Sequence, residues 1–460
     1  MDPFFSRLLS DSRGQAFDLH RSFINPGFVD LLQMAGYGRT FVRASGTDLV
    51  DEEGHTYLDF CSGYGVLNLG YNHPAVKAAL REVLDADLPG FAQVDCQLLE
   101  GLAAQALSRV LPPGLDRVFF CCTGTEAVEA ALKLARASTK RTRLVGCEGA
   151  YHGLTLGSLA LNGNAAMRTP FEPLTPGVTR IPFDDVRALE RELSRRDVAA
   201  FVVEPIQGEG GCVVPRAGYL RAARELCDRT GTLLVLDEVQ TGLGRTGSLF
   251  SFQRDGIVPD CVCLAKALSG GQVPVGAMVA RGAVHARAYG STATQGLHST
   301  TFGGGPLAMA AVLATLKVIQ EDRLTETAAD LGHHLKDRLQ DLAHRHPIIR
   351  EVRGHGLMLA LKFEDASRGW LERTPLSKLT GASAGLLVQH VALQLINEHR
   401  IVAQSAVNDP GVLKVMPPLV VRREQCDRFV DALDRVLDGL GHGSAIARLA
   451  LEALKAKAGR

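Results

Sequence analysis

The sequence lacks an excess of charge of either sign. Its 460 residues include 50 Lys and Arg against 50 Asp and Glu, so the formal net charge at pH 7 is zero. This balance argues against a broad basic surface for nucleic acid or anionic lipid. No run approaches the roughly 18 uninterrupted apolar residues of a membrane span, and the first 15 residues hold no signal-peptide core. We therefore expect a cytoplasmic protein with no nucleic-acid and no membrane partner.

Cysteines at metal-ligand or redox spacing are also absent. The chain has ten cysteines, but no pair forms a C-x-x-C motif. Most lie in apolar runs, such as those at 119–122 and 261–264. Reduced, buried cysteines are typical of a cytosolic protein, whereas a disulfide scaffold is small and far richer in cysteine. We expect neither a disulfide framework nor a metal site.

Glycine, by contrast, is abundant: 48 of 460 residues, above the usual share of roughly 7%. The excess has no collagen-like period, so we expect it in turns and close backbone approaches. Hydrophobic residues make up 46% and charged residues 22%, which is ordinary for a folded globular protein. The length predicts two to four structural units.

Short, continuously apolar segments alternate with helical segments in the middle of the chain. The predicted strands are 117–120, 144–147, 199–203, 233–236 and 261–264, with helices at 125–137 and 219–230. Such strands, separated by helices, are typical of a mostly parallel sheet that is buried on both faces. The sequence therefore predicts an α/β fold.

The rest of the chain is divided around this sheet. We predict an N-terminal segment (1–75), a large domain (76–335), a smaller α+β domain (336–440) and a C-terminal tail helix (441–460). The N-terminal segment is expected to be irregular apart from two short strands, with a turn at Asn25–Gly27.

A turn of small residues joins a predicted strand to a predicted helix at Cys122–Thr125. The free N–H groups and the dipole at a helix start favour an anion, and small residues let a phosphate approach the backbone. The same pattern is also typical of a plain N-cap, and no G-x-x-x-x-G-K-[ST] motif supports a nucleotide site. Both interpretations stay open from these residues alone.

Two charged residues directly follow buried strands. Asp237 stands at the strand end where open α/β sheets bind ligands. In a ligand-binding role a buried Asp stays ionised only beside a positive partner. The alternative roles for Asp237 are a helix cap and a metal ligand. Lys266 follows the strand at 261–264. Most lysines are solvated, but an apolar setting lowers the pKa of the amine and favours nucleophilic chemistry.

Together the turn at Cys122–Thr125, Asp237 and Lys266 meet the requirements of pyridoxal 5'-phosphate (PLP). This cofactor needs a cup for its phosphate, which residues 123–125 offer. It needs a carboxylate to keep its pyridine nitrogen protonated, which Asp237 offers, and an amine for its aldehyde, which Lys266 offers.

The sequence resembles the class III, ornithine-type aminotransferases, which are fold type I PLP enzymes, over about residues 25–435. The motifs that carry the resemblance are Thr123–Lys133, Tyr151–Gly153, Glu204–Gly211, Asp237–Gly247, Lys266, Thr301–Gly304 and Pro417–Leu419. Residues 25–28 and 119–133 look most like the putrescine (diamine) members. The resemblance implies a PLP-dependent aminotransferase that forms a homodimer with shared active sites, or a tetramer.

The resemblance also implies residue roles. Lys266 would bond the cofactor and move the substrate proton, and Asp237 would pair with the pyridine nitrogen. The other expected cofactor contacts are Gln240 at the phenolic oxygen, Tyr151 on the ring face, the backbone of Thr123, Gly124 and Thr125 at the phosphate, and Thr301 reaching the phosphate of the other subunit. His152 is expected as a further contact or as a packing residue only. Expected substrate contacts are Tyr64, in the loop lining the channel, the gate residue Glu209, and Lys414.

Three positions depart from the family pattern. Gly305 replaces an Asn, Cys122–Thr123 replaces Asn-Ser, and Lys414 replaces the Arg that binds a substrate carboxylate. Because a lysine cannot form a bidentate fork, we expect a diamine, alkyl amine or ω-amino donor, with an oxo acid or aldehyde acceptor. In the resting site Glu209 would pair with Lys414.

Three alternatives remain. One is an ornithine-like α-amino acid donor. Another is a different PLP reaction, such as aminomutation, racemisation or decarboxylation. The last is an inactive relative used as a binding protein, which the presence of both Lys266 and Asp237 disfavours.

Overall fold

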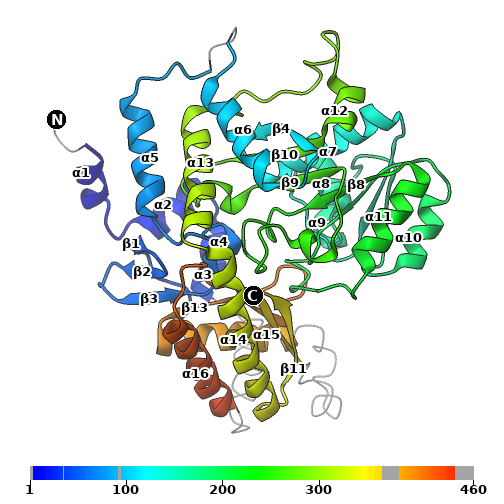
Figure 1. Cartoon of the computed structure of the whole chain (residues 1–460). Coiled ribbons are helices and arrows are strands. Elements are labelled where there is room, and N and C mark those ends of the chain that lie inside the picture. The colour runs from blue at the N-terminus through cyan, green and yellow to red at the C-terminus, as the bar shows by residue number, and fades with distance from the viewer. Residues whose placement is uncertain (1–3, 35, 92–94, 365–382, 441–460) are drawn as a thin grey trace.

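The computed structural model describes residues 4–34, 36–91, 95–364 and 383–440, and its centre is a seven-stranded sheet (Figure 1). The strands are β4 (Leu115–Cys121), β5 (Arg143–Cys147), β6 (Val178–Ile181), β7 (Val198–Val203), β8 (Leu233–Asp237), β9 (Cys261–Leu264) and β10 (Gly276–Arg281). Their order is β4-β10-β9-β8-β7-β5-β6, parallel from β6 to β9, with β10 antiparallel to both of its neighbours. The predicted, mostly parallel α/β sheet is confirmed.

Helices cover both faces of this sheet. They are α5 (Pro74–Asp85), α6 (Leu98–Val110), α7 (Gly124–Thr139), α8 (Leu156–Leu161), α9 (Ala165–Arg168), α10 (Val186–Leu193), α11 (Tyr219–Thr230), α12 (Gly282–Tyr289) and α13 (Pro306–Glu321). Successive strand residues point to opposite faces. Leu234 of β8 packs in the core shared with α10 and α11, and Val235 packs in the core shared with α7 and α12. This two-sided burial explains why the central strands read as continuous apolar runs.

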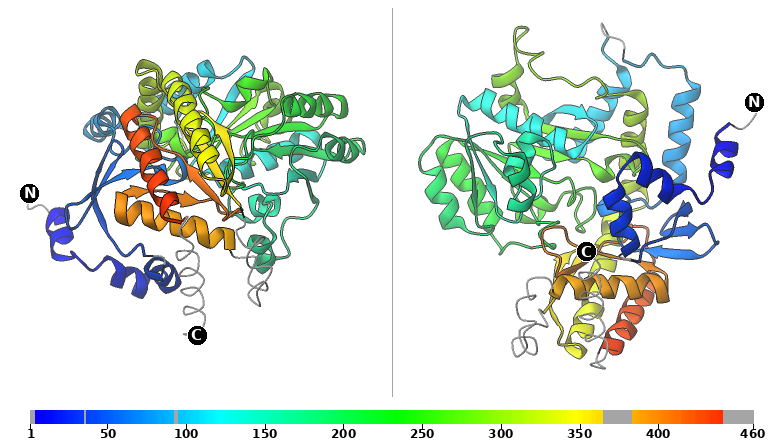
Figure 2. Two further views of the ribbon diagram at one scale, coloured as in Figure 1. Left: turned by 90° about the horizontal axis from the view of Figure 1, so that it is seen from below. Right: turned by 180° about the vertical axis from the view of Figure 1, so that it is seen from behind.

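The N-terminal segment is more regular than predicted. It forms α1 (Phe4–Asp11), α2 (Ala16–Phe23), α3 (Pro26–Met34), β1 (Phe41–Ser45), β2 (Asp48–Asp51) and β3 (Thr56–Asp59). The predicted turn at Asn25–Gly27 is wrong, because α3 begins at Pro26, and proline suits a first helical position, where no N–H partner is required. Figure 2 shows these elements on the side of the molecule away from α10 and α11.

A smaller α+β unit lies below the large sheet (Figure 1). It contains α14 (Leu324–Arg345), β11 (Ile349–His355), β12 (Met358–Phe363), α15 (Ser383–His399), β14 (Gln404–Ser405), β15 (Val412–Val415) and α16 (Arg423–Leu440), with the sheet order β11-β12-β15-β14. The short β13 (Ile401–Val402) pairs in parallel with β3 of the N-terminal sheet. The predicted boundaries at 75, 335 and 440 stay predictions, and the predicted helix at 441–460 lies outside the described residues.

One buried arginine ties the parts together. The guanidinium of Arg245 donates hydrogen bonds to the Leu357 carbonyl (3.0 Å) and to Asn68 Oδ1 (2.6 Å). Burial lowers the pKa of Arg245 to about 10. Its hydrogen bonds therefore join the N-terminal segment, the large sheet and the small unit close to the candidate site.

The structure also shows the state of the cysteines and the character of the helices. All ten cysteines are free thiols, and seven of them are buried. Among the described helices, none has the length and apolar character to cross a membrane.

Candidate active site

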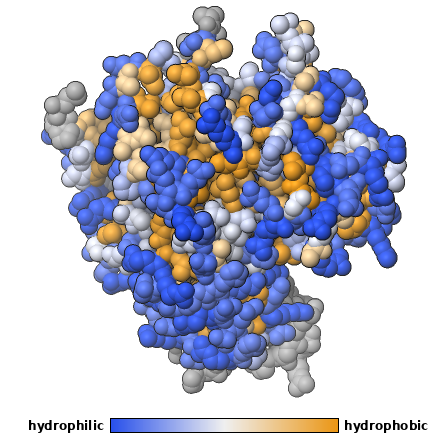
Figure 3. Space-filling view, in the orientation of Figure 1, coloured by the Kyte–Doolittle hydropathy of each residue, from blue (hydrophilic) through white to orange (hydrophobic). Residues whose placement is uncertain are grey.

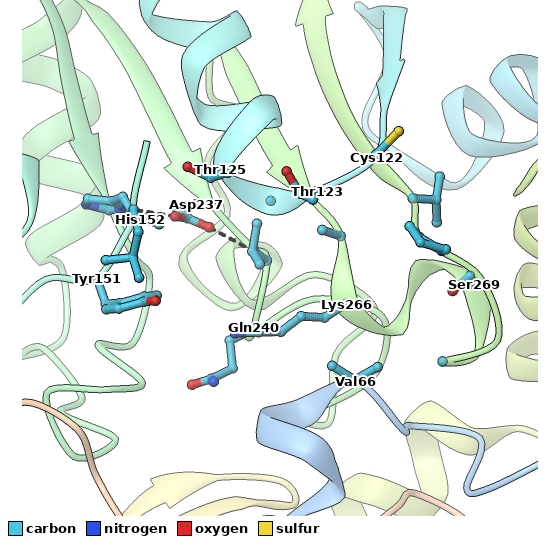
Figure 4. Close-up of a pocket in the computed structure, with 18 of the residues that line it drawn as sticks. Val66, Cys122, Thr123, Thr125, Tyr151, His152, Asp237, Gln240, Lys266 and Ser269 are labelled. Carbon is cyan, nitrogen blue, oxygen red and sulfur yellow. Dashed lines mark hydrogen bonds and ion pairs between the residues drawn. The ribbon is translucent and has the colours of Figure 1, made fainter. Parts of the chain in front are cut away.

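A pocket of about 580 Å³ opens at the carboxyl ends of β8 and β9 (Figure 4). Nine residues predicted from the sequence line it: Thr123, Gly124, Thr125, Tyr151, His152, Glu209, Asp237, Gln240 and Lys266. Val66, Cys122, Leu154 and Val273 add an apolar wall. Residues more than 140 positions apart in the chain therefore meet in one cavity.

The start of α7 forms one end of the pocket. Thr123 is the N-cap, and its hydroxyl accepts a hydrogen bond from the Glu126 N–H (3.3 Å). In the part of the chain described, no partner is recorded for the N–H groups of Gly124 and Thr125. A Cβ at Gly124 would lie 2.9 Å from Val239, so only glycine fits here without a shift. The turn is thus both a capped helix start and a small-residue cradle with free donors.

Asp237 and His152 form a buried pair on another wall. Asp237 ends β8, and its Oδ2 lies 2.7 Å from His152 Nδ1 (Figure 4). Its Oδ1 accepts the Val239 N–H at 3.0 Å. Burial acts to lower the pKa of His152, but the hydrogen bond and negative charge of Asp237, together with the charge of Glu204, outweigh burial and raise the pKa. His152 therefore lies within hydrogen-bond distance of the carboxylate, and its predicted contact with the cofactor stays a prediction.

Lys266 reaches into the pocket from the end of β9 (Figure 4). Its backbone has φ +46°, a left-handed conformation uncommon for lysine. Among the described residues, no hydrogen bond or ion pair of its amine is recorded. Burial lowers the pKa of the Lys266 amine, partly offset by the negative charge of Glu209. A lowered pKa increases the neutral, nucleophilic fraction of the amine.

Glu209 and Lys414 form the buried ion pair that the sequence predicts. Glu209 Oε1 lies 2.5 Å from Lys414 Nζ, and Lys414 is only 2% exposed. The Gln240 amide also donates to Glu209 Oε1 (3.0 Å), and the Val407 N–H donates to Oε2 (3.2 Å). Burial acts to raise the pKa of Glu209, but the charge and hydrogen bond of Lys414, together with Lys266 and Gln240, outweigh burial and lower the pKa.

Tyr64 covers this ion pair from a left-handed turn, α4 (Ser62–Gly65). The Lys414 ammonium lies 4.9 Å from the centre of the Tyr64 ring, within cation–π range. Tyr64 itself has φ +63°, and its carbonyl accepts a hydrogen bond from the Gln240 amide (2.9 Å). The Gln240 amide nitrogen is therefore shared between Tyr64 and Glu209, and its predicted contact with the phenolic oxygen stays a prediction.

Three predicted site residues do not line this pocket: Tyr64 and Lys414 lie beside the lining residue Glu209, whereas Thr301 lies apart. It is an exposed residue between α12 and α13 and does not line the cavity of its own chain. Beside it, Phe302 is 64% exposed and makes an edge contact with Phe91 at 5.3 Å.

Glu204 is a pocket residue to which the sequence interpretation gave no role. It follows β7 directly, and burial raises the pKa of its carboxyl to about 7. The signal was available in the sequence, because Glu204 follows a continuously apolar strand just as Asp237 does.

An α/β sheet of this topology with a lysine, an aspartate and a phosphate-sized cradle at its strand ends defines a PLP-dependent transferase. The family model of the class-III aminotransferases matches residues 34–437. The chain therefore belongs to the class-III aminotransferases.

Known proteins of this family are similar over most of the chain. The aminotransferase PigE of Serratia sp. is 38% identical, covering 93% of this chain but 54% of PigE, so the chain spans about half of that protein. The putrescine aminotransferase of Pectobacterium atrosepticum is 40% identical, covering 91% and 88%. The solved ornithine aminotransferase of Toxoplasma gondii has a TM-score of 0.80 and 30% identity, covering 95% and 98%.

The pocket fits the PLP on which this family depends. The N–H groups of Gly124 and Thr125, which have no partner among the described residues, suit a phosphate, and the carboxylate of Asp237 suits a protonated ring nitrogen. The Lys266 amine, likewise without a hydrogen bond in the described part of the chain, suits an aldehyde.

Proposed function

We propose that the protein transfers an amino group from a diamine, alkyl amine or ω-amino donor to an oxo acid or aldehyde. The observation that carries this proposal is the buried pair of Glu209 and Lys414. The similarity to a putrescine aminotransferase supports it.

The pair favours a donor without an adjacent carboxylate. Lys414 is a single point charge that Glu209 already neutralises, with the Tyr64 ring on a further side. An α-carboxylate would have to displace a buried, hydrogen-bonded Glu209 and would then gain one contact instead of a fork. A terminal amine needs no such displacement. A small oxo acid acceptor could use Lys414 once Glu209 moves.

We assign the residue roles on the same grounds. When bound, PLP supplies an electron sink for the carbon that carries the amino group. Lys266 holds and moves the proton at that carbon, and Asp237, oriented by His152, faces the ring nitrogen. Tyr151 covers the ring face, and the backbone of residues 123–125 binds the phosphate.

We also propose a homodimer with shared sites, or a tetramer, in the cytoplasm. Phe91 (39% exposed) and Phe302 (64%), which contact each other, leave the surface beside Thr301 apolar and exposed. Figure 3 shows hydrophobic side chains gathered in the upper part of this face, around α13. A second copy would cover such a surface and bring Thr301 to the neighbouring phosphate. The ten free cysteines support a reducing compartment.

A second candidate donor is an ornithine-like α-amino acid. The similarity to the ornithine aminotransferase of T. gondii favours it. Under this alternative the carboxylate binds through residues other than Lys414, or binds Lys414 alone.

The test is a single half-reaction without acceptor. The yellow holoenzyme is mixed with 1,4-diaminobutane, with a linear alkyl amine, or with ornithine, and the absorbance of the bound cofactor is followed. We expect the diamine and the alkyl amine to bleach the cofactor faster than ornithine at equal concentration. Faster bleaching by ornithine would support the second candidate, and no bleaching by any amine would contradict transamination.

A further inference from the structure

Glu204 connects two loops on different sides of the pocket. Its carboxylate follows β7 and is 6% exposed. Oε1 accepts the Tyr151 N–H at 2.9 Å, and Oε2 accepts the Gly208 N–H at 3.0 Å. Within the described residues no salt bridge of Glu204 is recorded. Both oxygens are therefore committed to backbone donors from two separate segments.

These segments carry groups with different proposed tasks. Tyr151 and His152 belong to the first, and Glu209 directly follows Gly208 in the second. The Gly208 backbone packs against the Gln240 side chain, since a Cβ there would lie 1.7 Å from Gln240 Oε1. The Glu204 carboxylate thus sets the spacing between the backbone of Tyr151 and that of Glu209.

We infer that Glu204 is a positioning residue for the reaction. It holds the Tyr151 ring and the Glu209 carboxylate in fixed positions relative to each other. This inference rests on the proposed roles of Tyr151 and Glu209. It extends them by naming the group that couples the cofactor side of the pocket to the substrate side.

Accepting hydrogen bonds from two backbone N–H groups requires a carboxylate at position 204. A carboxylate accepts at both oxygens, whereas an amide accepts at one and donates at the other, and a backbone N–H cannot reverse its direction. Neutral hydrogen bonds also connect these loops. Gln207 Nε2 donates directly across to the Glu148 carbonyl (2.8 Å). Asn408 bridges the loops, because its Nδ2 donates to the Gly149 carbonyl (3.0 Å) and its backbone N–H donates to the Glu209 carbonyl (2.9 Å). They should keep the loops folded when the bond to Tyr151 or to Gly208 is lost.

The test compares Glu204→Gln with Glu238→Gln. Glu238 is also buried, with its pKa likewise raised to about 7, but it does not line the pocket. Its partners are the backbone N–H groups of Phe252 and Ser251 and the Thr241 hydroxyl, and the hydroxyl can reverse its bond to suit an amide. The first readout is the visible circular dichroism of the bound cofactor, which reports the setting of its ring and needs no turnover. The second is the kcat and KM of each half-reaction.

We expect Glu204→Gln to stay yellow, to change the visible circular dichroism, and to lose about 100-fold in kcat/KM. The KM of an oxo acid acceptor should rise, because the Glu209 loop shifts. Glu238→Gln should keep the wild-type dichroism and remain within about twofold in kcat/KM.

The inference is overturned if folded Glu204→Gln keeps both the wild-type dichroism and the wild-type kinetics, or if Glu238→Gln changes both to the same extent. Should Glu204→Gln fail to fold, Glu204→Asp keeps the charge but is one carbon too short to reach both donors, and the same changes are expected. Because the dichroism depends only on bound cofactor, an absence of turnover in the wild type would count against the proposed function and not against this coupling.

Discussion

At the scale of single residues, the pocket shifts the pKa values of three ionisable groups in different ways. Burial lowers the pKa of Lys266, Lys414 lowers that of Glu209, and burial raises that of Glu204 to about 7. Near neutral pH, Lys266 therefore has a larger neutral fraction than an exposed lysine, while Glu209 stays ionised. The same pocket is thus lined by an amine with an increased neutral fraction and by a charged carboxylate.

Lys266→Ala should lose turnover by about 10⁴-fold or more, because the same amine both bonds the cofactor and moves the proton. The variant should still retain PLP through the contacts at residues 123–125 and at Asp237. Steady-state rates and the spectrum of the dialysed protein check both points. Normal transamination by this variant would refute the role of Lys266.

Asp237→Asn should keep the fold but slow the half-reaction by about 100-fold, because a neutral amide no longer favours a protonated ring nitrogen. Stopped-flow absorbance with a saturating amine donor measures the step directly. A near-wild-type rate would mean that Asp237 does not face the ring nitrogen.

At the scale of elements, the strand ends and one left-handed turn build the site. β7, β8 and β9 each deliver a charged residue, Glu204, Asp237 and Lys266, to the same edge of the sheet. These positions can be predicted from the sequence, because a charged residue directly after a buried parallel strand lies at the carboxyl edge of the sheet, where such folds bind ligands. The turn at 62–65 does not follow, because left-handed conformations at Ser62 and Tyr64 are imposed by their tertiary contacts.

Gly65→Ala tests this turn against a matched control. Gly65 has φ +85°, and a Cβ there would lie 3.1 Å from Met416, whereas Gly54 has φ +83° with nothing within 4 Å. Both substitutions should cost about 1–2 kcal/mol of stability through backbone strain. Only Gly65→Ala should also reduce kcat/KM, because it displaces Tyr64 from Lys414. Equal kinetic effects of both variants would contradict the role of the turn.

The Glu209–Lys414 pair predicts a pH-dependent stability. The folded-state pKa of Glu209 lies below its unfolded value near 4.5. The pair therefore stabilises the protein above that pH, and this contribution is lost as the pH falls through the folded-state pKa. Lys414→Met leaves an unpaired buried carboxylate and should cost about 3 kcal/mol at pH 7.

In Lys414→Met the carboxyl can protonate instead of staying buried as an unpaired charge. The gap in Tm between this variant and the wild type should therefore shrink as the pH falls from 7 toward 4.5. Lys414→Arg, which keeps the charge, should show a much smaller gap throughout. A gap in Lys414→Met that does not change with pH would show that the pair contributes no ionic stabilisation.

At the scale of the whole molecule, the sequence predicts best the strands that are buried on both faces. The central strands β5, β7, β8 and β9 are buried on both faces and stand out as apolar runs. The four-residue β6 has one fully buried residue, and α1 and α2 have none, so no clear pattern marks them. Likewise, the contact of Glu204 with Gly208 and Tyr151 joins segments about 50 residues apart, which no local pattern encodes.

Assembly provides another prediction at this scale. Thr301→Arg should weaken PLP retention in the assembled protein, because Thr301 is proposed to reach the phosphate of the neighbouring subunit. Sedimentation at working concentration should show a dimer or larger species for the wild type. A fully active monomer would contradict the shared site.

The most direct measurement of the central claim is the ratio of kcat/KM for 1,4-diaminobutane to that for ornithine, in the wild type and in Lys414→Arg. We predict a ratio well above one in the wild type, because the neutralised lysine gives an α-carboxylate little to bind. The ratio should fall about tenfold or more in Lys414→Arg, because the arginine can form a bidentate carboxylate contact. A wild-type ratio below one that Lys414→Arg leaves unchanged would contradict selection of the donor by the Glu209–Lys414 pair.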